Sequence, residues 1–285
     1  MPGLWVFVTA NRRLGCGAGW ALEQGAEETQ LGSRAILGAA HPNDRPLSVG
    51  RRGEGFAAFS RRRVVKRIVK QSTPPGVREA LRKLRTEIDI ARRHRRGVKA
   101  AAKYVGRTDQ KLQLGCGPRL KEGWVNVDLG DKADVQLDLR RPLPFETASC
   151  SIVYAEHFLE HVEYPGPVSL LLGEIRRVLK PGGTVSVAVP DIEMVMQSYI
   201  NGGSPEYYEA QKQWAPDYCE THVEFVNYNF RQGGEHQFAY DFETLKRLFT
   251  HCGFVNVTRR DYDPALDSED RIVGSLYVEA KTRLE

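Results

Sequence analysis

From residue 111 onward, short apolar runs alternate with segments of helical periodicity, and this alternation constrains the fold more than any other feature. The pattern is typical of a mostly parallel β-sheet with helices on both faces. Five strands are expected in succession and two more close the sheet, over residues 111–114, 124–127, 135–137, 152–155, 184–189, 255–258 and 275–280. The predicted class is therefore α/β, with a seven-stranded, mostly parallel sheet.

Two helices are clearest from the apolar spacing. The first has apolar residues at i, i+3, i+4, i+7, i+10 and i+11 between Val168 and Leu179, and the residues KPGG at 180–183 end it. The second begins at a predicted N-cap, Asp241, and stops at Gly253.

Charge is divided unevenly along the chain. Residues 51–111 contain 20 Lys and Arg but only 5 Asp and Glu, whereas the whole chain has a net charge of +5. We therefore expect an irregular segment over 1–50, a basic helical extension over 51–105 and a main domain over 106–285. Within the extension, a short amphipathic helix is expected over 60–70, followed by a longer one with regularly spaced apolar residues from Val77 to Ala91.

Three roles stay open for the basic extension. The first role is that of a solvated appendage that packs on the domain. The second is peripheral attachment to anionic lipid, and the third is binding of nucleic-acid phosphates. No run of about 18 apolar residues exists, so no transmembrane segment is expected. The five cysteines are scattered, which favours a reducing compartment. The expected location is cytoplasmic, with peripheral membrane contact through residues 51–103 left open.

Glycines and carboxylates follow the first three predicted strands. The first strand runs into Gly115-Cys116-Gly117, the second ends at Asp128 and the third at Asp138. In an open parallel sheet, ligands bind outside the carboxyl ends of the strands. Glycine lets the backbone approach a ligand closely, and a carboxylate accepts hydrogen bonds from ribose hydroxyls or an exocyclic amine. These strand ends therefore predict a nucleoside-binding crevice.

Five stretches extend this pattern in a fixed order. They are LQLGCG at 112–117, GWVNVDL at 123–129, DVQLDLRRPLPF at 134–145, SIVYAEHFLEHV at 151–162 and EIRRVLKPGGTVSVAVPD at 174–191. On these residues the chain resembles the class I, Rossmann-like methyltransferases that use S-adenosylmethionine, in particular the type 11 group. The resemblance implies that fold, that cofactor and a methyl acceptor.

The resemblance also implies roles for individual residues. Gly115 and Gly117 would line the methionine part of the cofactor, Asp128 would hold the ribose, and Asp138 would flank the adenine. Only ten residues separate Gly117 from Asp128, so the first crossover helix is expected to be nearly absent. Gln113 and Leu114 stand where the family has an acidic residue. The implied cofactor-binding residues are Leu114, Gly115, Cys116, Gly117, Asp128, Leu129, Asp138, Leu139, Ala155 and Glu156.

Residues 157–161, HFLEH, match the H-x-x-E-H pattern of inverted zinc peptidases. On a helix, His157 and His161 would lie at i and i+4 and reach one zinc ion, with Glu160 as general base. Such an enzyme needs a third ligand on a separate helix and has no nucleoside crevice, so no metal is predicted. For His161 we expect a capping role or a buried, hydrogen-bonded position.

Two histidines are the candidates for a catalytic base or a substrate contact. His157 follows the fourth strand at the mouth of such a fold, and His236 lies in the stretch that leads to the last helix. Asp191 and His222 are alternatives. The insert at 192–240 is rich in aromatic residues and is expected to form a substrate lid. The same aromatics would equally serve to close a small subdomain core.

The predicted function is transfer of a methyl group from S-adenosylmethionine to a small-molecule or glycan-type acceptor, at oxygen or nitrogen. A hydroxyl acceptor needs a base, whereas a carboxylate acceptor does not. The alternative function, from another class, is a non-catalytic cofactor-binding or interaction protein. Its basic extension would target it to membrane or RNA.

Overall fold

The computed structural model describes residues 73–203 and 205–284. The described residues from Leu81 onward belong to one compact unit, and residues 73–80 belong to another. The expectations for residues 1–50 and for a helix over 60–70 lie outside the described residues. None of the described helices combines the length and the apolarity needed to cross a membrane.

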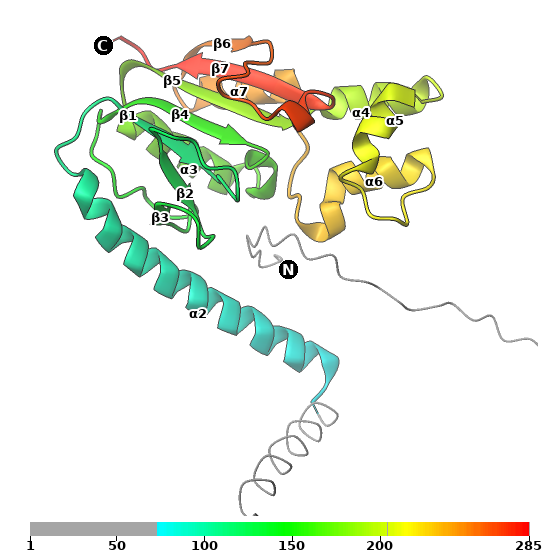
Figure 1. Ribbon diagram of the computed structural model, residues 1–285, viewed down its shortest axis with the longest axis horizontal. Helices are drawn as coiled ribbons and strands as arrows, with labels where there is room; N and C mark the ends of the chain where they lie inside the picture. The colour runs from blue at the N-terminus through cyan, green and yellow to red at the C-terminus, as the bar shows by residue number, and fades with distance from the viewer. Residues whose placement is uncertain (1–72, 204, 285) are drawn as a thin grey trace, which may run out of the picture. The chain divides into compact units, whose positions relative to one another are not determined.

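The sheet has seven strands in the order β3-β2-β1-β4-β5-β7-β6 (Figure 1). All neighbouring strands are parallel except β7, which runs antiparallel to both β5 and β6. This order confirms the predicted α/β class and the mostly parallel sheet. The strands are β1 (Gln110–Leu114), β2 (Val125–Asp128), β3 (Val135–Gln136), β4 (Cys150–Glu156), β5 (Leu179–Pro190), β6 (Val255–Arg259) and β7 (Ser275–Lys281).

Both helices read from the apolar spacing are present. They are α3 (Gly166–Val178) and α7 (Phe242–His251). Asp241 caps α7 as predicted, because its carboxylate accepts a hydrogen bond from the Thr244 amide at 2.8 Å. The expected turn at residues 180–183 after α3 is wrong. These residues belong to the first part of β5, which begins at Leu179, and Leu179 pairs with Cys150 across a register shift. The remaining helical segments are α4 (Ile192–Ile200), α5 (Pro205–Lys212), α6 (His222–Arg231), η1 (Ala102–Tyr104), η2 (Leu159–His161), η3 (Gln232–Gly234) and η4 (Glu269–Arg271).

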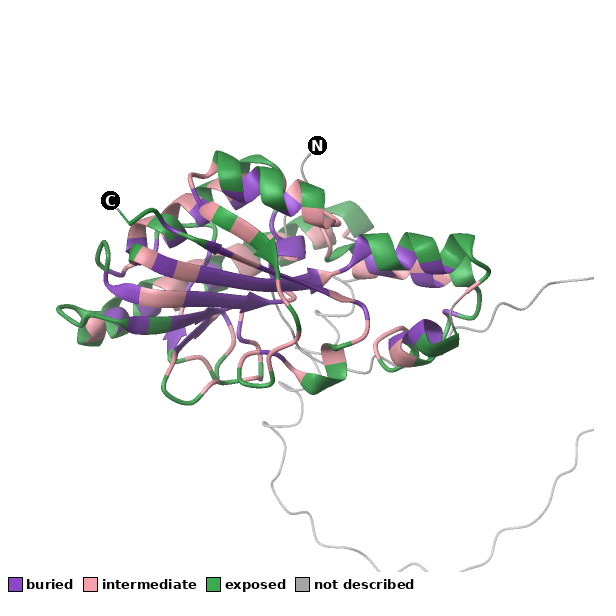
Figure 2. Cartoon of the chain, turned by 90° about the horizontal axis from the view of Figure 1, so that it is seen from above, coloured by how far each residue is buried: buried purple, intermediate pink, exposed green. Residues whose placement is uncertain are grey.

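One face of the sheet is apolar. Val153 and Ala155 on β4 and Val185 and Val187 on β5 are buried in one cluster with the inner residues of α3 and α7. Alternate residues of a strand point to the same face, so this valine-rich set forms the main core. Figure 2 shows the buried residues concentrated along the central strands, with the exposed residues on the outer sides of the helices.

The opposite face carries polar side chains and is covered by loops. Tyr154 donates to Asp267 at 2.9 Å, and Arg260 donates to Ser186 at 2.9 Å and to both oxygens of Asp267. Residues 115–124 contain no helix, which confirms the nearly absent first crossover helix. A loop has no continuous apolar face with which to cover a sheet. Hydrogen bonds to these buried polar groups therefore take the place of helix packing on this face.

Helix α2 (Pro75–Ala101) runs without a break through a cluster of four arginines, Arg92, Arg93, Arg95 and Arg96. The regularly spaced Leu81, Leu84 and Ile88 are exposed, whereas Ile90 and Gly97 are buried. A Cβ atom at Gly97 would lie 1.9 Å from the Gln136 carbonyl oxygen of β3. The helix therefore approaches the backbone of the edge strand so closely that only glycine fits, and it covers an edge that would otherwise be open.

We predict that Gly97→Ala destabilises the protein by about 1–3 kcal/mol, because the new methyl group forces α2 away from β3. Gly173→Ala in the middle of α3 is the control, since nothing lies within 4 Å of the added atom. It should stabilise the helix by up to about 1 kcal/mol. Denaturant unfolding of both variants measures the difference, and equal effects would contradict the close packing of α2 on β3.

Candidate functional site

The turn after β1 lies beside the end of β4. Leu114 pairs with Ala155 in the parallel register, so Gly115 after β1 and Glu156 at the end of β4 lie at the same level. Gly115 and Gly117 have φ values of +66° and +51°, a left-handed conformation that favours glycine. A Cβ atom at Gly115 would lie 2.4 Å from the Phe158 ring. The missing side chain at Gly115 therefore lets the Phe158 ring pack directly against the turn.

Asp128 is fixed against this turn by main-chain hydrogen bonds. Its Oδ2 accepts from the Gly117 amide at 3.0 Å and its Oδ1 from the Gly130 amide at 2.6 Å. Each carboxylate oxygen has a second lone pair available for a ligand. The sequence-predicted ribose residue and the glycine turn are therefore brought together, 11 residues apart in the chain.

Asp138 is buried and engaged by Arg140. The Arg140 guanidinium donates to both Asp138 oxygens at 2.8 and 3.0 Å, and it also pairs with Glu87 of α2. Burial opposes ionisation, but the Arg140 guanidinium lowers the pKa of Asp138 below its usual value. His94 of α2 accepts a hydrogen bond from the Asp138 amide at 3.3 Å. Sequence analysis did not detect these partners, and the role of Asp138 at an adenine stays a prediction.

The other cofactor candidates have mixed surroundings. Leu114, Ala155 and Leu139 are buried in the main core. The Leu129 carbonyl accepts from Arg93 at 3.0 Å. Burial raises the pKa of Cys116 to about 12, so its thiol is protonated at neutral pH.

Glu156 holds the segment after residue 267. Its carboxylate accepts from the amide and the hydroxyl of Ser268 at 2.8 and 2.6 Å. Arg271 donates to the Glu156 carbonyl at 3.4 Å. Glu156 therefore ties η4 to the end of β4, which sequence analysis did not anticipate, and its predicted contact with the cofactor stays a prediction.

His157 lies just past β4 in a left-handed conformation, with φ at +49°. Its amide continues the sheet by donating to the Ala188 carbonyl at 2.8 Å, and its Nε2 lies 2.8 Å from the Ser275 hydroxyl. Burial lowers the pKa of His157 well below the usual value, so the imidazole is neutral. Only residues 159–161 are helical here, so His157 and His161 do not occupy i and i+4 of one helix. The zinc-peptidase interpretation is therefore wrong.

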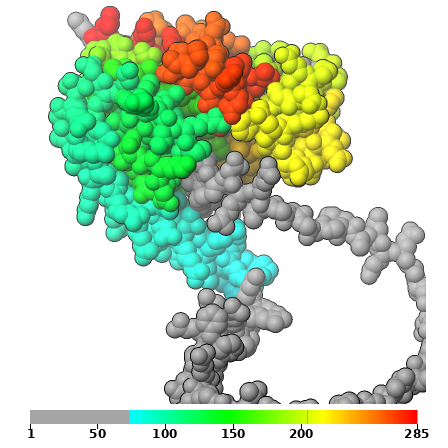
Figure 3. Space-filling view, viewed as in Figure 1, coloured from blue at the N-terminus to red at the C-terminus, as the bar shows by residue number. Residues whose placement is uncertain are grey.

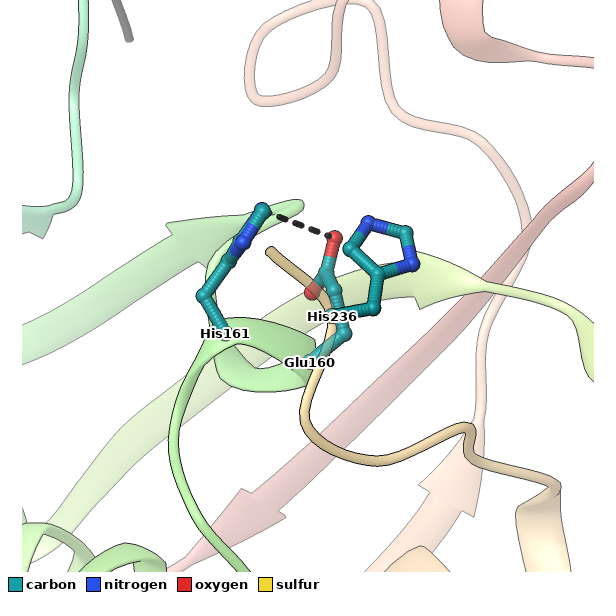
Figure 4. Close-up of side chains that lie close together, drawn as sticks. All are labelled: Glu160, His161 and His236. Atoms are coloured by element: carbon teal, nitrogen blue, oxygen red, sulfur yellow. Dashed lines mark ion pairs between the residues drawn. The ribbon is translucent and has the colours of Figure 1, made fainter. Parts of the chain in front are cut away.

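Glu160, His161 and His236 lie together beside His157. Their potential ligand atoms are all within 4.8 Å of one another (Figure 4). Burial raises the pKa of Glu160 to about 8 and lowers that of His161 to about 4. His161 contacts the Glu235 carbonyl at 3.1 Å, so the expected hydrogen bond is present, but its side chain is only partly buried. The two catalytic candidates His157 and His236 thus reach the same place from different segments.

These histidines line a cavity of about 140 Å³ beyond the ends of β4 and β5. The opposite wall comes from the insert, whose helices α4, α5 and α6 lie beyond these strand ends (Figure 1). In Figure 3 the insert, in yellow, lies against the orange and red residues that lead into β7. Sequence analysis missed Arg271 and Ser275, because no spacing pattern marks them. The wall also includes Gln211, Trp214, Tyr228 and Asn229.

The aromatics of the insert occupy two places, and the role of the insert as a substrate lid stays a prediction. Tyr207, Tyr208 and Phe225 close a small separate core, whereas Trp214 and Tyr228 line the cavity. The remaining catalytic alternatives have structural contacts. Asp191 caps α4 by accepting from two amides, and His222 stacks on Tyr208 with the rings 4.1 Å apart.

Comparison with known proteins finds a family model that matches the first part of the sheet. Residues 112–187 match the family model described as "Methyltransferase domain". Over these residues the chain is similar to methyltransferase domains. The matched residues include the glycine turn, Asp128, Asp138 and the end of β4. A search of curated proteins finds no match.

Three solved structures illustrate the range of similar folds. CurJ carbon methyltransferase shares 16% identity over 63% of this chain and 50% of its own, with a TM-score of 0.37. Phosphoethanolamine N-methyltransferase 2 from Haemonchus contortus, in complex with S-adenosylmethionine, shares 15% sequence identity. The match covers 66% of this chain and 52% of the other, with a TM-score of 0.38. A methyltransferase from Methanosarcina mazei shares 18% sequence identity. The match covers 65% of this chain and 97% of the other, with a TM-score of 0.39. The chain thus spans about half the length of the first two.

We predict that Asp128→Asn weakens binding of S-adenosylmethionine by about 1.5–3 kcal/mol, because the charged acceptor for the ribose hydroxyls is lost. Asp134→Asn is the matched control, since Asp134 accepts from the Asn126 amide at 2.9 Å in the neighbouring loop without a predicted cofactor contact. Calorimetric titration of both variants compares the affinities. Unchanged affinity in Asp128→Asn would remove Asp128 from the site.

Proposed function

We propose that this chain transfers a methyl group from S-adenosylmethionine to an oxygen or nitrogen atom of a small-molecule or glycan-type acceptor that binds in the cavity beside His157. The position of the cavity carries this proposal. It opens directly after Glu156, at the same sheet edge as the glycine turn and Asp128. Donor and acceptor sites would therefore be adjacent, as an in-line displacement requires.

The residues of the chain would act mainly by position. S-adenosylmethionine supplies the electrophilic methyl group when bound. His157 is neutral and held by Ser275, so it can accept a hydrogen bond or a proton from an acceptor hydroxyl or amine. The insert would exclude water from the cavity and act as the lid expected from its composition.

The lining of the cavity supports a polar acceptor with an apolar face. Gln211, Asn229 and Arg271 offer hydrogen bonds, and Trp214 and Tyr228 offer aromatic surface. The guanidinium groups of Arg119 and Arg271 each lie 5.6 Å from the Trp214 ring. A ring such as a sugar has both the hydroxyls and the flat face that such a wall recognises.

The direct test is a methyl-transfer screen with the full chain. S-adenosylmethionine is supplied with panels of sugars, phenols, amines and carboxylic acids, and release of S-adenosylhomocysteine is measured. We expect turnover with members of one polar class. Binding of the cofactor without turnover on any panel would favour the non-catalytic alternative.

We predict that His157→Ala lowers kcat for the best acceptor by roughly 10²–10⁴-fold, while cofactor affinity is unchanged, because a base or acceptor contact is lost. His251→Ala, an exposed histidine at the end of α7, is the control and should leave kcat unchanged. If His157→Ala retains full turnover, His157 has no part in the chemistry.

A further inference from the structure

Three side chains in the wall of the cavity form what we call the His–Glu cluster, namely Glu160, His161 and His236. Glu160 and His161 belong to η2, and His236 follows η3 some 75 residues later in the chain. Figure 4 shows the three side chains converging on one place, and its dashed line marks the 4.0 Å contact between His161 Nε2 and Glu160 Oε1. Their potential ligand atoms lie within 4.8 Å of one another.

The backbone holds the two halves of the cluster together. The amides of Gln237 and Phe238 donate to the Glu160 carbonyl at 2.7 and 3.3 Å. The His236 amide donates to the Arg231 carbonyl at 3.2 Å. The loop that carries His236 is therefore fixed against η2 by main-chain contacts, so the arrangement of the cluster is a property of the fold itself.

Main-chain carbonyls fix the tautomers of both histidines. Nδ1 of His161 lies 3.1 Å from the Glu235 carbonyl oxygen, and Nδ1 of His236 lies 2.6 Å from the Asn229 carbonyl oxygen. A carbonyl oxygen only accepts, so each Nδ1 carries the hydrogen and each Nε2 presents a lone pair. Metal-binding histidines show the same arrangement, in which a carbonyl or carboxylate orients the ring from behind.

Glu160 has a carboxylate oxygen that the described protein does not satisfy. Its side chain is 2% exposed, and Oε2 has no hydrogen-bond partner among the described residues. Oε1 lies 4.0 Å from His161 Nε2 and 3.7 Å from His157 Nδ1, both longer than a hydrogen bond. A buried carboxylate of this kind is costly unless a cation or a donor reaches it.

The donor set indicates which cation fits. Two imidazole nitrogens and one carboxylate suit zinc and related transition metals, whereas magnesium and calcium prefer oxygen ligands throughout. The rings of His161 and His236 lie 4.9 Å apart at an interplanar angle of 79°. One ligand atom of each of the three residues lies within 4.8 Å of the others, which is close enough for all three to bind one ion. We propose that the His–Glu cluster binds one divalent transition-metal ion of the zinc type.

Three protein ligands leave at least one coordination position open toward the cavity, as in catalytic rather than structural zinc sites. Arg271 lines the same cavity. Its positive charge favours an anionic oxygen, from hydroxide or from an acceptor, as the remaining ligand. Binding of the ion is independent of methyl transfer and is measured without it.

The test is calorimetric titration of Zn²⁺ into the untagged full chain after treatment with a chelator, with Mg²⁺ as a comparison. We expect one Zn²⁺ per chain at micromolar or tighter affinity and no comparable binding of Mg²⁺. Glu160→Gln and His236→Gln should each lower the Zn²⁺ affinity by at least about tenfold. Loss of a residue that only hydrogen-bonds to a metal ligand already lowers metal affinity by about tenfold or more, so loss of a ligand should cost at least as much. Circular dichroism of each variant checks that it folds.

His222→Gln and His251→Gln are the matched controls, because these histidines lie outside the cluster. They should leave the Zn²⁺ affinity unchanged. Absence of Zn²⁺ binding, or binding that survives Glu160→Gln and His236→Gln, would overturn the proposal.

A spectrum of the unsubstituted chain with Co²⁺ keeps the proposal testable if a variant does not fold. Nitrogen and oxygen ligands should give the visible bands of bound cobalt without a thiolate charge-transfer band. A thiolate band would show that cysteines bind the ion, and the proposal would be wrong.

Discussion

Leu114 at the end of β1 pairs with Ala155 of β4, and this register decides where every candidate residue of the site lies. Since parallel strands end at the same edge, Gly115 after β1 and Glu156 at the end of β4 lie side by side at that edge. Asp128 reaches the glycine turn from β2 through its bond to the Gly117 amide. His157 follows Glu156 into the cavity. A slip of this register would separate the cofactor candidates from the catalytic ones.

The short crossovers of this chain change how the sheet is covered. Helices α3 and α7 bury one face, and Tyr154, Ser186 and their partners Arg260 and Asp267 satisfy the other through hydrogen bonds. Burial of such groups is tolerated only when each donor meets an acceptor. The same loops carry Arg271, so covering the polar face also completes the wall of the cavity.

The strands and the N-cap of α7 were predictable from the sequence, because apolar spacing and an N-cap carboxylate are local signals. The positions of Gly115, Asp128 and His157 at one edge of the sheet were predictable, because the carboxyl ends of parallel strands share an edge. The partners of Asp138 and Glu156 were not predictable from the sequence. Arg140, which binds Asp138, also binds Glu87, and these two residues are 53 positions apart in the chain. Ser268 lies 112 residues from Glu156. The exposure of the apolar stripe of α2 was also not predictable from the sequence. The contact of Gly97 with β3 decides which face of α2 packs on the domain.

The most direct test of this account is a crystal structure of the full chain with S-adenosylhomocysteine. The account predicts that the ribose hydroxyls lie within hydrogen-bond distance of Asp128 and that the sulfur points toward His157 and the cavity. A nucleoside bound elsewhere, or one whose sulfur points away from the cavity, would contradict it.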